Sequence, residues 1–236
     1  MKNLAAVLFS ALPVGAENTI DIPSSWANDY VANIKNTSAI SIDKLMNNYQ
    51  RNITRGEFAY LCVKLYEYYT GQEIIEGEKY FKDTLDEWVL KAKRASLVNG
   101  DPDNIYRTDD YIHREEIAVL FVNVFVAADA IYKDETSELF ADDSTISKWA
   151  KKSVYIAKAN KIIGGIGKNK FDPSGFATRE QALVMLSRAI PLVPRNLSRL
   201  PKFGIDKIVL RDVESSIQSI TLTSGPRDIA VLYQRS

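Results

Sequence analysis

Three arginines in this 236-residue chain occupy the same place in a short repeated motif. Arg55 lies in Thr-Arg-Gly-Glu, Arg114 in His-Arg-Glu-Glu and Arg179 in Thr-Arg-Glu-Gln, with spacings of 59 and 65 residues. Thr followed three residues later by Glu or Gln is the capping box that begins a helix. An arginine in the first turn opposes the helix dipole, so its recurrence calls for an anionic partner. A guanidinium beside the free N–H groups of a helix start is suited to holding an acidic group.

A structural salt bridge to a neighbouring Asp or Glu would also account for these arginines, and this alternative stays open on the sequence alone. The second motif differs from the others because His113 stands where they have Thr. His is a poor N-cap, so the helix that follows is expected to fray or to be held differently. As the one histidine of the chain, His113 has no co-ligands for a metal and no triad partners.

Each motif is followed by an amphipathic helix. Apolar residues recur at i, i+3, i+4 and i+7, in the same register relative to each arginine. They are Phe58, Leu61, Cys62 and Leu65; then Ile117, Leu120, Phe121 and Val124; then Ala182, Met185, Leu186 and Ala189. Three equivalent apolar stripes predict a central bundle of three helices.

A shorter helix and a loop precede each motif. Trp26, Trp88 and Trp149, spaced by 62 and 61 residues, mark the three shorter helices. A period of this size indicates three copies of one unit. The loop residues at 99–103, Asn-Gly-Asp-Pro-Asp, and at 164–167, Gly-Gly-Ile-Gly, are interpreted as turns. The first fails the calcium-loop pattern, and the second follows a helix where a dinucleotide site needs a strand.

The composition excludes several classes of function. Lys and Arg balance Asp and Glu at 30 each, which removes the charge expected of a general nucleic-acid binder. We find no nucleophile elbow, zinc motif or P-loop, so neither an enzyme nor a cofactor is predicted. The single Cys62 lies on an apolar stripe and is interpreted as a small core residue.

The two ends of the chain differ from the repeats. Residues 1–16 have one Lys, an apolar run and small residues, the pattern of a secretory signal; the alternative is a buried helix. No other segment approaches the length that spans a membrane. After Pro191 the alternating segments at 207–213, 217–222 and 229–233 predict three short strands.

The combined marks resemble those of S-layer homology domains, the cell-wall anchoring modules of bacterial surface proteins. In the third unit they are Phe140-Ala-Asp, Trp149-Ala, Ile-Ile-Gly164, Phe171-Asp-Pro and Thr-Arg179, and the other units repeat part of this set. The resemblance covers roughly residues 22–191 and implies repeats at 17–79, 80–139 and 140–193. The remaining segments are the predicted signal peptide at 1–16 and the β-rich extension at 194–236. The resemblance implies an all-α fold, a three-pronged spindle around the central bundle.

The resemblance also implies where a ligand binds. Grooves between adjacent prongs are expected to hold a secondary cell-wall polymer, an anionic glycan that is often capped by a pyruvylated amino sugar. The motif arginines would meet the acidic group, while aromatic and loop residues hold the sugar. The implied ligand-binding residues are Arg55, Arg114, Arg179, Trp26, Trp88, Trp149, Gly100, Asp101, Gly164 and Gly165. The first loop, residues 36–52, lacks the Gly and Pro of the others, so one or two working grooves are expected.

Two functions remain open on the sequence. The leading one is a secreted, non-catalytic anchor that binds cell-wall polysaccharide at the S-layer surface of a Gram-positive-type bacterium. The alternative is a protein–protein assembly module of an S-layer or spore surface. The motif arginines favour the first function, and the degenerate first loop favours the second.

Overall fold

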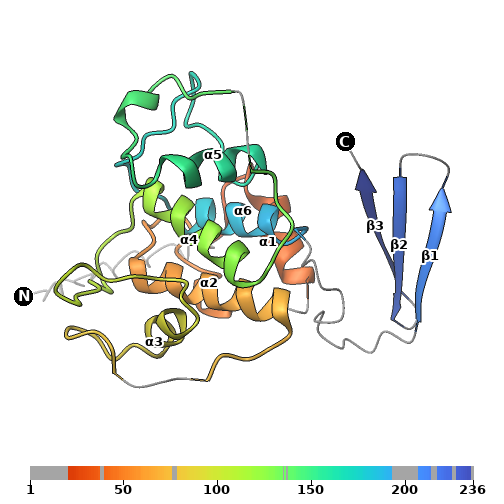
Figure 1. Ribbon diagram of the computed structural model, residues 1–236, viewed down its shortest axis with the longest axis horizontal. Coiled ribbons are helices and arrows are strands. Elements are labelled where there is room, and N and C mark those ends of the chain that lie inside the picture. The colour runs from red at the N-terminus through yellow and green to blue at the C-terminus, as the bar shows by residue number, and fades with distance from the viewer. Residues whose placement is uncertain are drawn as a thin grey trace, which may run out of the picture.

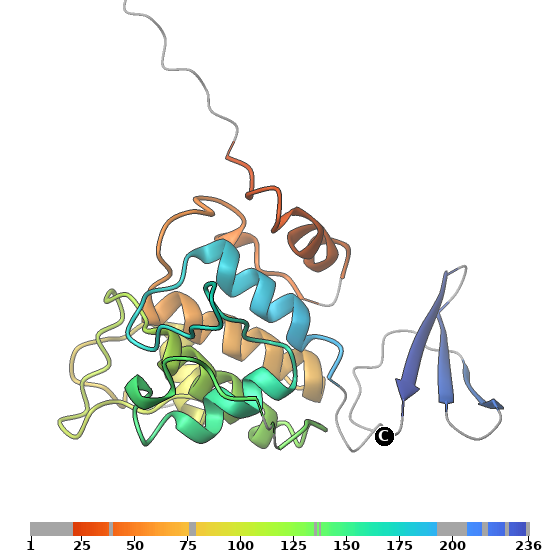
Figure 2. The ribbon, with the colours of Figure 1, turned by 90° about the horizontal axis from the view of Figure 1, so that it is seen from above.

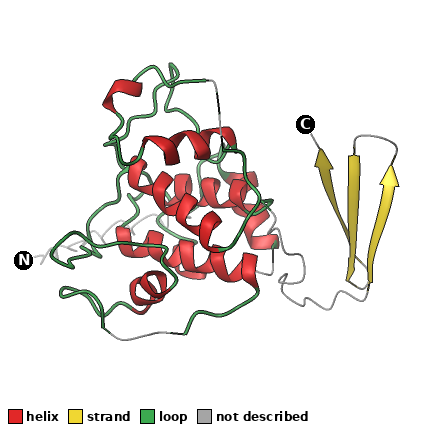
Figure 3. Ribbon diagram, in the orientation of Figure 1, coloured by secondary structure: helices red, strands yellow, loops and turns green. Residues whose placement is uncertain are grey.

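The structure is a computed structural model, and it describes residues 21–37, 40–75, 79–134, 136, 138–192, 207–213, 217–224 and 227–234. The predicted signal peptide lies outside these residues. Up to residue 192 the described chain is helical, as predicted (Figure 1 and Figure 3). The α-helices are α1 Asn28–Asn36, α2 Arg55–Thr70, α3 Glu87–Arg94, α4 Arg114–Ala127, α5 Lys151–Ala159 and α6 Arg179–Ala189, with short 3-10 turns at Asp43–Leu45 and Asp143–Thr145.

The three predicted strands are also present, as β1 Lys207–Val213, β2 Ile217–Ser224 and β3 Arg227–Gln234. They form an antiparallel meander in the order β1-β2-β3. Thr221 of β2 lies opposite Val209 on one side and Ala230 on the other. β2 and β3 are each longer than the sequence pattern predicted.

The helices that follow the motifs begin where the capping boxes place them. Thr54 and Thr178 are the N-caps of α2 and α6, and both capping boxes are formed. The apolar stripes are buried, apart from Leu120, which is half-buried. Helix α2 contacts both α4 and α6. Between α2 and α4, the rings of Phe58 and Phe121 meet edge to face with centroids 5.4 Å apart. The core therefore lies among the three long helices.

The shorter helices do not pack mainly within their own units. Helix α3 packs on α2, α5 packs on α4, and α1 packs on α6. Each first helix thus rests on the second helix of the preceding unit, and α1 closes the circle by packing beside α6 (Figure 2). The packing of each unit is completed by its neighbour.

A ring of backbone hydrogen bonds joins the starts of the three long helices. The first residue of each helix donates its N–H to a carbonyl just before the next long helix in the circle. The bonds run from Arg55 to Asp110 (2.9 Å), from Arg114 to Gly175 (2.9 Å) and from Arg179 to Arg51 (2.8 Å). N–H groups at a helix start have no partner within the helix, so these bonds satisfy donors and join the units together.

The second helix start is held differently, as the presence of His113 predicted. The His113 backbone N–H donates to the Glu116 carboxylate at 2.9 Å, as the cap N–H groups do in the other two units, so the difference lies in the His113 ring. The imidazole Nδ1 lies 2.7 Å from the Ser174 carbonyl oxygen, and the ring stacks on Phe176 with centroids 4.9 Å apart. Contacts with the third unit therefore fix this helix start.

The Phe-x-Asp marks have a structural role as loop braces. The Asp142 carboxylate accepts hydrogen bonds from the backbone N–H groups of Phe171 and Asp172, both at 2.8 Å. Asp83 makes the equivalent pair of bonds in the second unit, at 2.9 and 2.7 Å. Burial alone would raise the pKa of Asp142, but these hydrogen bonds outweigh burial and lower that pKa.

We predict that Asp142→Asn destabilises the protein by about 1–3 kcal/mol at pH 7, because it weakens two hydrogen bonds to a charged acceptor. Urea unfolding measures the difference. A lowered pKa contributes stability that is complete above the unfolded-state value and is lost as the carboxylate is protonated. The gap between wild type and variant should therefore close as the pH falls below about 4. Replacement of the exposed Asp109 by Asn is the control, and an equal effect there would contradict the brace.

Candidate functional site

Two of the three motif arginines are paired with carboxylates of another unit. The Arg55 guanidinium forms an ion pair with Glu116, and its Nε donates to the Tyr106 carbonyl at 2.8 Å. Nη2 of Arg179 lies 2.5 Å from Oε1 of Glu57. Glu57 and Glu116 are also the capping-box residues of α2 and α4. The salt-bridge alternative therefore describes Arg55 and Arg179.

Arg114 differs because it has no ion pair among the described residues. Its side chain is 4% exposed. Nε donates to the Phe171 carbonyl at 2.8 Å, and Nη2 donates to the Gly164 carbonyl at 3.0 Å. Burial lowers the pKa of this guanidinium, against an opposing effect of Asp172 and Asp142. Arg114 is thus a buried cation held by backbone carbonyls.

The difference follows from one position in the sequence. Glu116 and Glu57 are the third residues of their helices, and the third residue of α6 is Gln181. The Gln181 side-chain oxygen accepts a hydrogen bond from the Thr178 N–H at 3.2 Å, as in the other capping boxes. An uncharged amide preserves the cap but supplies no counter-ion for Arg114.

The tryptophans fall into two kinds. Trp26 and Trp149 directly precede the N-cap residues of α1 and α5, and they are 51% and 60% exposed. Trp88 lies inside α3 and is half-buried against Tyr60, with ring centroids 4.7 Å apart. The Lys64 ammonium lies 4.6 Å from the centroid of the Trp88 ring.

The predicted equivalence of the three tryptophans is wrong for Trp88. Ala92 and Ala157 each accept a hydrogen bond from the N–H five residues later, at 2.8 and 3.0 Å, so they are equivalent positions. Trp88 lies four residues before Ala92, as Ser153 does before Ala157. Trp88 therefore corresponds to Ser153, one helical turn beyond Trp149. The third unit has an additional 3-10 turn at Asp143–Thr145, which changes the sequence spacing.

Most of the predicted loop residues have structural explanations. A Cβ added to Gly100 would lie 2.7 Å from a ring carbon of Phe81, and one added to Gly165 would lie 2.7 Å from the Lys170 carbonyl oxygen. The Asp101 carboxylate accepts hydrogen bonds within its own loop. Gly164 is the exception, since a Cβ there would meet nothing within 4 Å.

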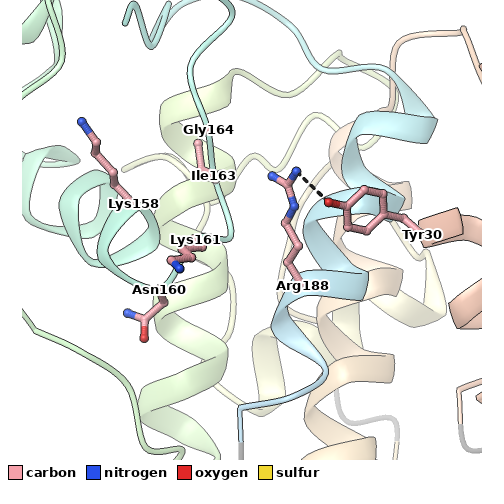
Figure 4. A pocket seen from close by; sticks show the side chains of 7 residues that line it. All are labelled: Tyr30, Lys158, Asn160, Lys161, Ile163, Gly164 and Arg188. Carbon is pink, nitrogen blue, oxygen red and sulfur yellow. Dashed lines mark hydrogen bonds between the residues drawn. The ribbon is translucent and has the colours of Figure 1, made fainter. Parts of the chain in front are cut away.

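Gly164 lines an open cleft of about 610 Å³ between α1, α6 and the end of α5 (Figure 4). Three cationic side chains and one tyrosine contribute to its wall. Nη2 of Arg188 donates to the Tyr30 hydroxyl at 3.3 Å, and the guanidinium lies 4.9 Å from the centre of the Tyr30 ring. The lining residues are Tyr30, Lys158, Asn160, Lys161, Ile163, Gly164 and Arg188.

The sequence motifs did not predict the other cleft residues, which are Tyr30, Lys158, Asn160, Lys161, Ile163 and Arg188. The position of Arg188 in the repeat gave a partial indication of a repeated placement of a cation. Arg188 lies ten residues after the cap residue Thr178, as Lys64 lies ten residues after the cap residue Thr54. Tyr30 could not be paired with Arg188 from the sequence, because 158 residues separate them.

Comparisons with known proteins identify the class. Residues 139–183 match the S-layer homology domain family. The chain is 30% identical over 241 residues to the surface-layer 125 kDa protein of Lysinibacillus sphaericus, covering 97% of this chain and 19% of that protein. It is 30% identical to exoglucanase XynX of Acetivibrio thermocellus over 70% of this chain and 16% of that protein. An amylopullulanase of Thermoanaerobacterium thermosulfurigenes is 27% identical, with coverage of 70% and 9%.

The chain spans less than a fifth of the length of each of these relatives. Residues 139–183 carry an S-layer homology domain, a non-catalytic anchoring module. The third unit belongs to the S-layer homology family, and the similarity to surface-layer proteins supports a role in cell-surface anchoring. Within the described residues, no helix is both long enough and apolar enough to cross a membrane.

We predict that Gln181→Glu stabilises the protein, because it places a carboxylate where Glu57 and Glu116 meet their arginines. A partly buried pair of this kind should contribute about 1 kcal/mol, or roughly 2–4 °C in melting temperature. The pKa of Glu57 is lowered: burial has the largest single effect and raises it, but Arg179, the Thr54 N–H and Arg51 together outweigh burial. The gain from Gln181→Glu should likewise be lost at acid pH.

The matched control is Glu116→Gln, which removes the carboxylate from Arg55 and should destabilise the protein. Thermal unfolding of both variants at pH 7 and pH 3 tests the scheme. An unchanged or lowered melting temperature for Gln181→Glu at pH 7 would contradict the equivalence of the three positions.

Proposed function

We propose that the chain is a non-catalytic anchor of three S-layer homology units that binds an anionic secondary cell-wall polymer. The match of the third unit to the family supports this function. The ring of equivalent hydrogen bonds at the three helix starts supports the assignment of the first two units to the same family and a spindle arrangement of all three. A secreted protein with this role would act at the cell wall.

The observation that carries the proposal is that Arg114 forms no ion pair within the described residues. Asp142 and Asp172 act on it only at a distance. A buried cation that no described carboxylate contacts is costly, and an acidic group of a ligand would supply that direct contact. Gly164, whose carbonyl accepts the Arg114 hydrogen bond, also lines the open cleft. A carboxylate on a sugar, such as a pyruvyl group, has the planar geometry that a guanidinium binds.

The number of working grooves follows from the same argument. Glu116 and Glu57 already place carboxylates on Arg55 and Arg179, so an incoming acid would have to displace them. We therefore assign polymer binding mainly to the groove bordered by Arg114 and the third-unit loop. Trp149 belongs to the third unit and is exposed, as a sugar-stacking residue must be.

Arg114→Ala should weaken binding to isolated cell-wall sacculi by about ten- to a hundredfold, because it removes a charge-assisted contact. Arg114→Lys should recover part of the loss, since it keeps the charge but not the planar fork. Arg55→Ala is the matched control and should lower the melting temperature with little effect on binding. Sacculi stripped of their attached polymer should bind neither the wild-type protein nor any of these variants.

The competing result is equally distinct. If Arg114 serves only to hold the Phe171 and Gly164 carbonyls, Arg114→Ala will lower the melting temperature and leave binding of the folded protein unchanged. That outcome would end the proposal that Arg114 contacts the polymer.

One observation favours the assembly alternative. Tyr111 and Phe176, which are 43% and 46% exposed, lie together near the ring of helix starts with ring centroids 5.6 Å apart. Exposed aromatic residues in contact are common at protein–protein interfaces. Concentration-dependent self-association that Phe176→Ala abolishes, together with equal binding to stripped and intact sacculi, would favour assembly over polymer binding.

A further inference from the structure

Two of the cations in the cleft between α1, α6 and the end of α5 have no carboxylate partner among the described residues. Arg188 and Lys161 form no ion pair within the described residues, and Lys161 makes no hydrogen bond there through its side chain. The Lys158 ammonium is engaged elsewhere, 4.1 Å from the centre of the Phe140 ring and 3.9 Å from a Glu138 oxygen. It points away from Arg188 in Figure 4.

The remaining polar residue, Asn160, is also satisfied. Its amide donates to the Lys133 and Ile156 carbonyls, both at 2.8 Å, and its oxygen accepts from the Lys133 N–H at 2.9 Å. The groups left for a ligand are the Arg188 guanidinium, the Lys161 ammonium and the Tyr30 ring.

The equivalent position in the first unit is filled by the protein itself. Lys64 on α2 corresponds to Arg188, and Trp88 on α3 corresponds to Tyr30. Lys64 is paired with Glu67 at 2.9 Å. The Trp88 ring is approached by Lys44 at 5.3 Å and by the Tyr60 ring at 4.7 Å.

The equivalent position in the second unit is closed by a hydrogen bond. Asn123 on α4 corresponds to Arg188, and its amide donates to the Leu97 carbonyl at 3.0 Å. The residue that corresponds to Tyr30 is Ser153, which offers no ring. Of the three related positions, the third therefore combines a cation, an aromatic ring and an open cleft.

The chemistry of these groups defines the ligand class. A guanidinium and an ammonium without a carboxylate partner favour an anion, and a tyrosine ring offers an apolar face to a sugar. A volume of about 610 Å³ is within the range of ligand-sized clefts. We propose that Arg188, Lys161 and Tyr30 form a second subsite for a sugar that carries an acidic group, a carboxylate or a phosphate.

This subsite rests on the proposed function. It would give the protein a second contact along the same polymer, in addition to the contact at Arg114. Gly164 connects the two places, since it lines the cleft and its carbonyl accepts from Arg114 at 3.0 Å. Two acidic groups on one chain could then be held together, and linked contacts raise the apparent affinity well above that of either alone.

The test uses glucuronate and glucose 6-phosphate as acidic probes and glucose as the neutral comparison. Amide NMR shifts of Gly164 and Lys161 should respond to at least one acidic sugar and not to glucose, and the acid that binds identifies carboxylate or phosphate. Arg188→Gln and Lys161→Gln should each raise the dissociation constant at least fivefold. Lys64→Gln, at the equivalent position of α2, should change it less than twofold.

Because the Lys161 side chain makes no hydrogen bond or ion pair within the described residues, Lys161→Gln keeps the test decisive even if Arg188→Gln unfolds. Shifts of equal size with glucose, or no shift with either acid, would overturn the subsite. Sacculus binding that persists in that case would leave the proposed function intact. Acid-sugar binding without any sacculus binding would instead retain the subsite and remove the proposed function.

Discussion

The fold depends on a contact that no single unit makes for itself, the packing of each first helix on the second helix of the preceding unit. Helix α1 completes this pattern by packing on α6, so the first and last units are neighbours. Repeat proteins that stack in a line leave two ends to be capped. Here the hydrogen bond from the Arg179 N–H to the Arg51 carbonyl joins the last unit to the first, and the three helix starts form a closed ring.

This closure explains the arginines at the helix starts. The ring brings each long helix against the loop of a neighbouring unit, and the motif arginine reaches that loop. Arg55 and Arg114 donate through Nε to equivalent backbone carbonyls, of Tyr106 and Phe171. A buried guanidinium needs a counter-ion as well as hydrogen-bond acceptors. The capping-box glutamates supply one in direct contact at two places. Gln181 leaves Arg114 without an ion pair in the described part of the chain, where Asp142 and Asp172 act on it only at a distance.

The sequence predicted the features that depend on local chemistry. The capping residues Thr54 and Thr178 fixed the helix starts, and the 3.6-residue period identified the buried stripes. It could not predict which unit packs on which, because every unit offers similar apolar faces. Trp88 was placed one turn out of register, since an additional 3-10 turn in the third unit altered the spacing that tryptophan positions alone suggested. The pairing of Tyr30 with Arg188 arises only when the ring closes.

The open cleft is therefore best understood as a departure from the repeat. Of the three related positions, two have polar side chains with partners in the protein: Lys64 pairs with Glu67, and Asn123 donates to the Leu97 backbone carbonyl. A protein selected for stability alone would gain by satisfying the third in the same way, since groups left without partners lower stability. Arg114, Arg188 and Lys161 instead bring positive charge close to Gly164, which Arg114 contacts and which lines the cleft with the other two. The cost in stability is confined to the place where a ligand with the opposite charge would offset it.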